Sequence, residues 1–587
     1  MTVKLGIVQS AVLEARQFKI LTRHFFLRLF RNDLVDFEDQ MKERVIGILA
    51  MLAVFCGLVS YVFLGKYEFT PDQGQSWIEK MLFITLFMLI MGFVAILEWD
   101  VMFPDKSDQA NLSPLPLRVR TILSAKFASL LLFVSLFALS LNLLSSIFFV
   151  LLLPQWRSTS LLFFIGHTLV HFLIMFLACF FGFFLYIVLL GFFQSLLGGR
   201  IFAKASTYLR SLFLVIQLFL ILIYLRILVY GLDNLIPTEQ IRSNFPKIGR
   251  FFDYFPPFWF ADLYETALGN PRLPFHGRYR YALIGLAVMG LVFTATMGFA
   301  YGRSLRRIDT GHQLRLRKIR WFLEAVFNGL FLGNRTQRAI YHFYRKTLKS
   351  SVFHRMRLAT YVACGVAVVP FLITMRVVKK GHLLGINLTL VSIPLILSFV
   401  LLLGLRSVIS VPVSLEANWV FRLTEKPNIL AYFTGLRKAI LITKVVPLFV
   451  LVFAAYAILW DTRTALNHSL YGLAVSILVM EILFVQFMKI PFACSYLPGK
   501  EKIQVYWLPY LLGFIAYVNI VGRLELYLLK TPSESIFFFV AILLGIAGIR
   551  AYQVFSLYKR NRIMYEEVPE PVVIGLDYEL PQHRKGI

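Results

Sequence analysis

Residues 97–126 have the sequence LEWDVMFPDKSDQANLSPLPLRVRTILSAK and separate two long apolar runs. The segment contains three aspartates, one glutamate, three prolines and four basic residues. Proline prevents a helix from running on, and charged side chains avoid the hydrocarbon core of a membrane. The segment therefore predicts a polar connection between two membrane-spanning helices.

The composition of the whole chain is that of a membrane protein. Of its 587 residues, 58% are hydrophobic, and the mean hydropathy is +0.72. Soluble domains contain about 45–50% apolar residues, and a helix needs about 20 apolar residues to cross a bilayer. We therefore expect an all-α polytopic membrane protein. The twelve predicted spans are 45–64, 80–98, 122–153, 161–196, 209–232, 280–300, 358–375, 386–410, 441–460, 469–489, 506–523 and 535–555.

Lysine and arginine fix the expected orientation. The chain has 60 of them against 32 acidic residues, a net charge of +28. If the N-terminus is cytoplasmic, 44 basic residues fall in cytoplasmic segments and 15 in external ones. The positive-inside rule then places both termini in the cytoplasm. The basic excess is expected to face anionic lipid and not nucleic acid.

The opening segment has a counterpart 318 residues later, in EANWVFRLTEKPNILAYFTGLRKAILITK (416–444). Six of 29 ungapped positions are identical, and each copy lies between the second and third spans of six. This predicts a parallel duplication, with one half at 1–310 and the other at 311–587. Each half is predicted to begin with an amphipathic interfacial helix, at 9–31 and 336–352.

These features resemble the permeases of type-2 ATP-binding-cassette (ABC) exporters, here with two halves fused. The motifs that carry the resemblance are the opening segment, its copy NWVFRLTEKPNILAYFTGLRKAI and KIPFACSYLPGK (489–500). The resemblance implies that each half begins with a connecting helix. It also implies that the coupling segments 98–121 and 411–438 dock on an ATPase, and it covers nearly the whole chain.

The resemblance, together with the chemistry of the two segments, assigns the docking residues. Aspartates offer charges to a soluble partner, and Phe103 and Phe421 would be apolar anchors. The alternative is an ordinary cytoplasmic loop whose charges meet water. The candidate docking residues are Glu98, Asp100, Phe103, Pro104, Asp105, Asp108, Glu416, Trp419, Phe421, Arg422 and Glu425.

The chain itself is not expected to be an enzyme, because it lacks the pattern GxxxxGK[ST]. The resemblance implies that a cytoplasmic ABC ATPase, in two copies per permease, binds the ATP and Mg. No cofactor or metal is expected in this chain. The expected location is the bacterial inner membrane, with a cytoplasmic tail at 556–587.

Four ionisable residues inside predicted spans are candidates for substrate contact or gating. Arg226 could snorkel to the outer headgroups or contact an anionic group. Glu481, placed mid-way along its span, could face a cavity, pair with Arg226 or be neutral. His167 and His171 share one helix face, a spacing that can bind metal, but no third ligand is apparent.

We therefore expect a permease that exports a lipophilic or amphipathic substrate by alternating access. The external segment 251–269, with eight aromatic residues, is expected to lie at the membrane interface. The alternatives are an ion- or proton-coupled secondary transporter with six plus six spans, and a membrane scaffold that transports nothing.

Overall fold

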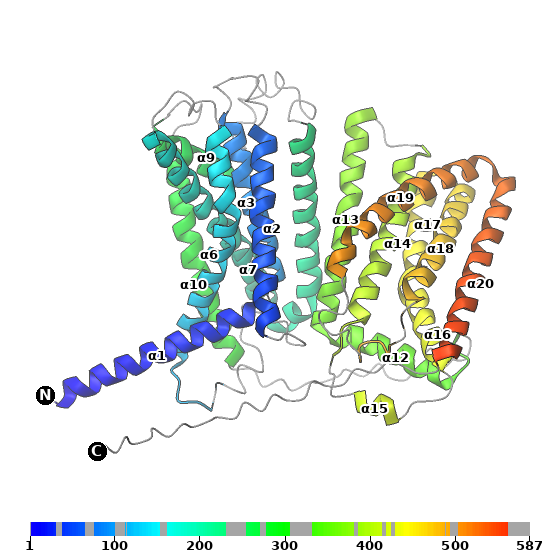
Figure 1. The fold of residues 1–587 in the computed structure, drawn as a ribbon, viewed down its shortest axis with the longest axis horizontal. Helices are drawn as coiled ribbons and strands as arrows, with labels where there is room; N and C mark the ends of the chain where they lie inside the picture. Colours follow the sequence, from blue (N-terminus) through cyan, green and yellow to red (C-terminus); the bar gives the residue numbers. More distant parts are fainter. Residues whose placement is uncertain are drawn as a thin grey trace, which may run out of the picture.

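The computed structural model describes residues 2–30, 38–64, 76–99, 112, 114–152, 161–230, 254–269, 277–305, 331–380, 385–413, 418–423, 429–485, 487, 489–493 and 503–560. Within these ranges the protein contains sixteen α-helices and no strand. The predicted all-α fold is therefore confirmed. Figure 1 shows that the helices stand side by side in two groups, with shorter helices across one end.

The first group forms around α3, α6 and α7. Its core consists of large apolar side chains, among them Phe83, Phe87, Phe149 and Phe181. The helices of this group are α1 (Thr2–Phe30), α2 (Glu38–Leu64), α3 (Ser76–Leu97), α6 (Val119–Leu152), α7 (Leu161–Tyr230), α9 (Pro256–Ala267) and α10 (Tyr279–Leu305).

The second group forms around α14, α16, α17 and α18. Its core includes Leu402, Phe433, Phe449 and Phe484. Its elements are α12 (Arg335–Ser350), α13 (Val352–Lys380), α14 (Leu388–Ile409), α15 (Asn418–Leu423), α16 (Ile429–Ile440), the π-helix η3 (Leu441–Val445), α17 (Val446–Leu459), α18 (Thr462–Phe484), α19 (Ile503–Lys530), the 3-10 helix η4 (Pro532–Glu534) and α20 (Ser535–Arg560).

Eleven helical segments of the described chain are long and apolar enough to cross a membrane. Each matches one predicted span. The remaining prediction, 45–64, corresponds to the shorter apolar stretch Val45–Tyr61 within α2. The multi-pass character read from the composition is thus confirmed.

The structure differs from the sequence prediction at the fourth and fifth spans. We expected separate helices, but the backbone from Leu161 to Tyr230 is helical throughout as α7. At 1.5 Å per residue a straight helix of this length would reach about 105 Å, several times the thickness of a bilayer core. α7 therefore holds two spans, Leu161–Leu197 and Ala205–Ile227. The residues between them, 198–204, include two glycines, which disfavour a helix, so propensity alone does not explain why the helix continues there.

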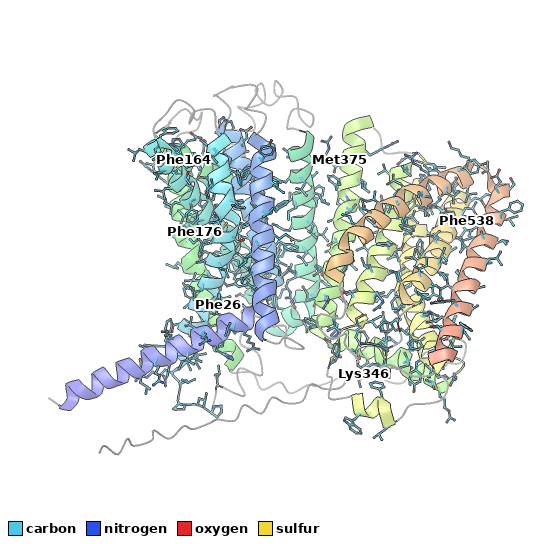
Figure 2. The ribbon with its side chains drawn as sticks, viewed as in Figure 1. Phe26, Phe164, Phe176, Lys346, Met375 and Phe538 are labelled. Atoms are coloured by element: carbon cyan, nitrogen blue, oxygen red, sulfur yellow. The ribbon has the colours of Figure 1, made fainter. Side chains whose placement is uncertain are left out.

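An aromatic ladder strengthens α7. Phe172, Phe176, Phe180 and Phe184 recur every fourth residue, so they lie on one face of the helix. Their ring centroids are 5.9, 5.1 and 5.8 Å apart in sequence order, and Phe184 stacks on Phe293 of α10 at 4.8 Å. Figure 2 shows Phe176 among the densely packed side chains of this group.

Polar caps mark the starts of three helices in the second group. Asn334 accepts from the backbone N–H of Thr336, Asn387 from that of Leu390, and Asp461 from that of Thr464. Such side chains satisfy N–H groups that have no partner within the helix. At Asp461, hydrogen bonds from the side chain and backbone of Thr464 lower the pKa of the carboxyl group.

The two groups of helices meet where α7 packs on α13. Ile96 of α3, Leu214 of α7 and Ala363 of α13 form a small buried cluster at this contact. Figure 1 shows α1, α12 and α15 at one end of the molecule, which we call the basic end, and α9 at the opposite end.

Candidate functional site

At the basic end, each amphipathic helix packs against a helix that begins inside a predicted coupling segment: α6 includes the last three residues of 98–121, and α16 includes the last ten of 411–438. α1 contacts α6, and α12 contacts α16. Buried apolar residues of α1 and α12 correspond at a constant offset of 319 positions: Leu21 and Ile340, Phe25 and Tyr344, Leu29 and Leu348. The same spacing of four residues puts each trio on one helix face.

This packing modifies the expectation for the amphipathic helices. We expected their apolar faces to enter the acyl region, but these faces are buried largely against protein. Leu21 and Phe25 pack with Ile122 and Ala125. The apolar face of α12 belongs to the core that contains Tyr432 and Leu436 of α16. An amphipathic helix needs its apolar stripe covered, and a neighbouring helix covers it as well as lipid does.

The contact between α12 and α16 depends on a glycine. A Cβ on Gly435 would lie 2.9 Å from Cα and 3.1 Å from the carbonyl oxygen of Gln337. Both atoms are backbone, so a side chain cannot rotate away to make room. Lys438 donates hydrogen bonds to the side chain of Gln337 and the carbonyl of Phe331, each at 3.1 Å, and so fixes the same contact.

We expect Gly435→Ala to destabilise the protein by about 1–3 kcal/mol, because overpacking forces α12 and α16 apart. The free energy of unfolding in detergent measures the effect. Gly513→Ala and Gly548→Ala are matched controls, since a Cβ at either helical position meets nothing within 4 Å. The controls should be neutral or stabilising by up to about 1 kcal/mol. Equal effects at all three positions would contradict the close approach.

The short helix α15 carries the docking candidates that the structure describes best. Trp419 and Leu423 are 62% and 76% exposed. Phe421 is half-buried and packs edge-on against Phe343 of α12, with ring centroids 5.3 Å apart. α15 thus presents apolar side chains outward while one aromatic ring anchors it to α12.

The other docking candidates are less completely placed. Glu98 directly follows α3, and its backbone N–H bonds to the carbonyl of Val94 at 3.0 Å. Arg422 is part of α15, but its side chain lies outside the described residues. Also outside them are Asp100, Phe103, Pro104, Asp105, Asp108, Glu416 and Glu425.

Glu481 is the centre of a buried charge cluster, which we call the basic-end triad (Arg437, Glu481 and Arg550). Its side chain is 0% exposed. One carboxylate oxygen lies 3.2 Å from Nε of Arg437 in α16. The other lies 3.0 Å from Nε and 2.9 Å from Nη2 of Arg550 in α20. The triad therefore joins α16, α18 and α20.

This geometry changes the interpretation of Glu481. We expected it mid-way along a span, with Arg226 as one possible partner. In the structure Glu481 lies three residues before the end of α18, at Phe484, and its partners come from α16 and α20. Arg226 is half-buried near the end of α7, in the other group of helices. The pairing between Arg226 and Glu481 is therefore wrong.

The opposite end of the first group contains the N-terminal outer cluster (Lys80, His167, His171, Tyr264 and Glu265). Lys80 of α3 forms a buried ion pair of 2.5 Å with Glu265 of α9. The ammonium group also lies 4.6 Å from the centre of the Tyr264 ring. The Tyr264 hydroxyl is hydrogen-bonded to Nδ1 of His171 at 3.2 Å. These contacts hold α9 against α3 and α7.

The same contacts change the expectation for segment 251–269. Its aromatic residues predicted an interfacial position, but in α9 Phe258, Phe260 and Tyr264 are buried. Phe181 of α7 packs on Phe260 with ring centroids 5.4 Å apart. Aromatic density is compatible with either location, because a ring contributes apolar area against protein as well as lipid.

The two candidate histidines have no third potential metal ligand beside them in the described part of the chain. No group of three or more potential ligands occurs there. His167 bonds the carbonyl of Phe163 at 3.1 Å, and His171 is enclosed by Phe83, Phe149 and Tyr264. His171 therefore helps to hold α9 through Tyr264, whereas the contacts of His167 lie within α7.

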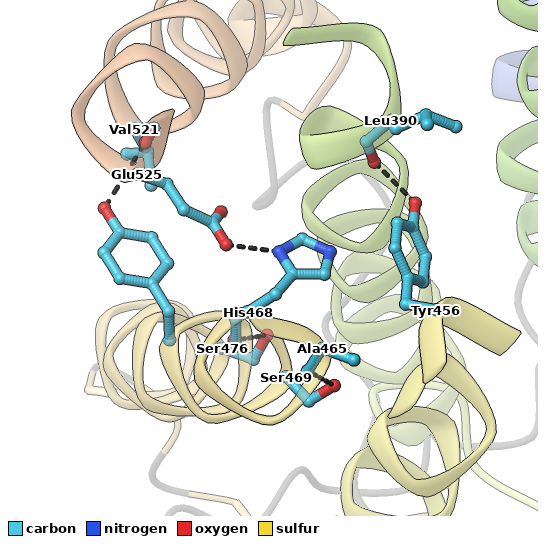
Figure 3. A network of polar contacts seen from close by, with 10 residues as sticks. Leu390, Tyr456, Ala465, His468, Ser469, Ser476, Val521 and Glu525 are labelled. Atoms are coloured by element: carbon cyan, nitrogen blue, oxygen red, sulfur yellow. Dashed lines mark hydrogen bonds and ion pairs between the residues drawn. The ribbon is translucent and has the colours of Figure 1, made fainter. Parts of the chain in front are cut away.

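The second group has a related arrangement, the C-terminal outer cluster (Tyr456, Trp460, His468 and Glu525). Figure 3 shows His468 of α18 bonded to Glu525 of α19. The His468 ring lies 4.6 Å from that of Tyr456 and 5.3 Å from that of Trp460, both from the end of α17. The Tyr456 hydroxyl donates to the carbonyl of Leu390 at 2.5 Å.

Sequence reasoning found Glu481, His167 and His171 but missed most of their partners. The overlooked partners lie near the ends of spans, where charged residues are common and do not by themselves indicate a functional site. They are Lys80, Glu265, His468 and Glu525. The correspondence between the two histidines appears only once the helix starts are known. His167 is the seventh residue of α7 and His468 the seventh of α18, whereas the span predicted from the sequence began at residue 469.

Comparison with known proteins leaves the structure as the main source of inference. No family model, curated protein or solved structure matches this chain.

Proposed function

We propose that this chain is the membrane-spanning permease of a type-2 ABC exporter with two fused halves. It would move a lipophilic or amphipathic substrate outward by alternating access. A separate ATPase, in two copies, would bind the ATP and Mg and supply the energy, so the chain would not itself be an enzyme. It would lie in the bacterial inner membrane with both termini in the cytoplasm.

The observation that carries the proposal is the repeated packing at the basic end. An amphipathic helix supports the end of each proposed coupling segment: α1 packs on α6, which begins inside 98–121, and α12 packs on α16, most of which lies inside 411–438. The matched trios give α1 and α12 the same spacing of buried residues. A soluble motor needs such a rigid platform, because force is lost through a segment that bends. The division at residues 310 and 311 agrees with this repeat.

The proposed docking surface has the chemistry of a protein interface. Trp419, Val420 and Leu423 are exposed together on α15. Exposed apolar residues in one place are typical of interaction sites, and tryptophan is frequent among the residues that dominate binding energy. The basic excess of the chain favours this end as the cytoplasmic side.

The test is binding of the ABC ATPase encoded beside this chain, with both proteins purified. We expect Trp419→Ala with Phe421→Ala to weaken binding about tenfold or more, because the first removes an exposed aromatic side chain and the second removes the ring that anchors α15 to α12. Tyr254→Ala is the control, since Tyr254 is even more exposed than Trp419 but adjoins α9 at the opposite end. Absence of an ATPase gene and of ATPase binding would contradict the permease proposal. Binding unaffected by the double substitution would contradict the docking assignment alone.

A proton-coupled transporter is the second candidate, and one observation favours it. Buried acid–base pairs occur at the opposite end of both groups, Lys80 with Glu265 and His468 with Glu525. Ionisable groups within membrane helices often form proton relays. Uptake or release driven by a pH gradient in proteoliposomes, without ATPase or ATP, would favour this candidate over the exporter. A scaffold would show neither activity.

A further inference from the structure

His468 and Glu525 form a closed acid–base pair inside the second group. Each side chain is 1% exposed, and Nδ1 of His468 contacts Oε1 of Glu525. The remaining polar atoms, Nε2 of His468 and Oε2 of Glu525, are buried and have no hydrogen-bond partner among the described residues. Buried polar atoms are almost always satisfied, so each of these two has spare capacity to hold or accept a proton or a water molecule.

Among the described residues, the groups with a recorded contact or interaction with the pair are neutral. From α17, Tyr456 and Trp460 face the imidazole ring. Tyr517 of α19, Tyr471 of α18 and Tyr456 also face Glu525. From α14, the Leu390 carbonyl accepts the hydrogen bond of the Tyr456 hydroxyl, and Ser398 faces Tyr517. Phenols are neutral near pH 7. Glu525 and His468 are therefore the ionisable groups of this cluster other than the phenols.

The corresponding place in the first group has different chemistry. His167 occupies the same seventh position of its helix as His468. The nearby acid, Glu265, pairs with Lys80 instead of a histidine. In water, histidine gains and loses its proton between about pH 5 and 8, far below the range in which lysine does so. The two clusters thus join their acids to bases of different intrinsic proton affinity.

We propose that His468 and Glu525 form a proton-binding site at the end of the molecule opposite the basic helices. The proton resides between imidazole and carboxylate, and the resulting ion pair ties α19 to α18. His468 is six residues past the start of α18, about 9 Å along the helix axis, so the path from the aqueous phase is short. The inference does not depend on ATPase docking and holds whether or not an ATPase binds.

Trp460 provides a built-in probe for the proton. An imidazolium ring quenches the fluorescence of a neighbouring indole, and the two rings are 5.3 Å apart at 62°. We expect the fluorescence of the full-length protein in lipid nanodiscs to fall as the pH is lowered through the site's titration. The signal of Trp460 is isolated as the difference between the unaltered chain and Trp460→Phe, because the chain has eight tryptophans.

Three variants test the assignment. His468→Gln should abolish the pH-dependent difference signal. Glu525→Gln should move its midpoint to lower pH, because a carboxylate stabilises the imidazolium beside it. His167→Gln, the matched control on α7, should leave both the signal and its midpoint unchanged.

Two outcomes would overturn the proton site. One is a Trp460 difference signal that is flat between about pH 5 and 8. The other is an unchanged midpoint in Glu525→Gln. If Glu525→Gln does not fold, Glu525→Asp keeps the charge on a shorter side chain. It must then retain a pH-dependent signal with a shifted midpoint, and an unshifted midpoint would again contradict the proposal.

Discussion

Replacement of Glu481 by leucine should destabilise the protein by about 3–5 kcal/mol, which is the cost of leaving a buried charge unpaired. The charge left unpaired is that of Arg437, because its side chain is only 8% exposed and Glu481 is its ion-pair partner. Arg550 is 56% exposed and can turn to water or lipid headgroups. Denaturant titration of the free energy of unfolding, in one detergent, measures the change.

A double variant separates the lost ion pair from lost packing. Arg437→Leu combined with Glu481→Leu removes both buried charges and should recover most of the stability, since apolar replacements of buried ion pairs are often neutral or stabilising. Glu534→Leu is the control for removing an exposed carboxylate, and its effect should stay within about 0.5 kcal/mol. A double variant as unstable as Glu481→Leu would show that the charges do not account for the loss.

Replacement of Lys80 by methionine should have an effect of similar size at the opposite end. Methionine keeps most of the length of lysine but leaves the Glu265 carboxylate buried without its 2.5 Å partner. We expect a loss of about 3–5 kcal/mol and detachment of α9, because the ion pair joins α9 to α3. Faster hydrogen exchange of residues 256–267 would report the detachment, and denaturant titration the loss of stability.

The pair between Arg118 and Glu14 is the control for burial. It joins α1 to the segment before α6, but Arg118 is 74% exposed. Exposed ion pairs contribute about 0.2–1 kcal/mol, so Arg118→Met should fall in that range. Equal losses from Lys80→Met and Arg118→Met would contradict the claim that burial sets the energy of these pairs. Lys80→Met with Glu265→Gln should regain part of the stability.

The membrane spans could be predicted because their signal is local. About 20 consecutive apolar residues identify a span whatever it packs against, so 386–410 was located within two residues of α14. The continuous helix through residues 198–204 could not be predicted in this way. Glycine and basic residues there are typical of a loop, and the helix forms because its neighbours, such as Phe202 against Trp99, are packed.

The partners of buried charges could not be predicted because they lie far apart in sequence. Glu481 is 44 residues from Arg437 and 69 from Arg550, and no helical periodicity links them. Glu481 itself was identified, since a carboxylate in an apolar run needs an explanation. Its assumed depth was wrong because the predicted span was placed at 469–489, whereas α18 begins at Thr462 and ends at Phe484.

The amphipathic helices show that an apolar stripe in the sequence does not distinguish a helix packed on lipid from one packed on protein. The apolar stripe of 336–352 was found correctly, and it covers Ile340, Tyr344 and Leu348. An apolar stripe indicates that the helix face is covered by apolar groups, and these groups can belong to lipid or to protein. Gly435 was the missing signal, because a glycine within a helix often marks the close approach of another backbone.

The π-helix η3 joins α16 and α17 into one continuous helix and rotates the side-chain positions of α16 relative to those of α17. The backbone N–H of Val446 bonds the carbonyl of Leu441, five residues back, just before Pro447, which has no N–H to give. A wide turn of this kind holds one residue more than an α-turn. Deletion of one residue from 441–445 would rotate the face that bears Arg437 by about 100° relative to α17. A related chain without the wide turn should therefore align with one residue fewer at this place.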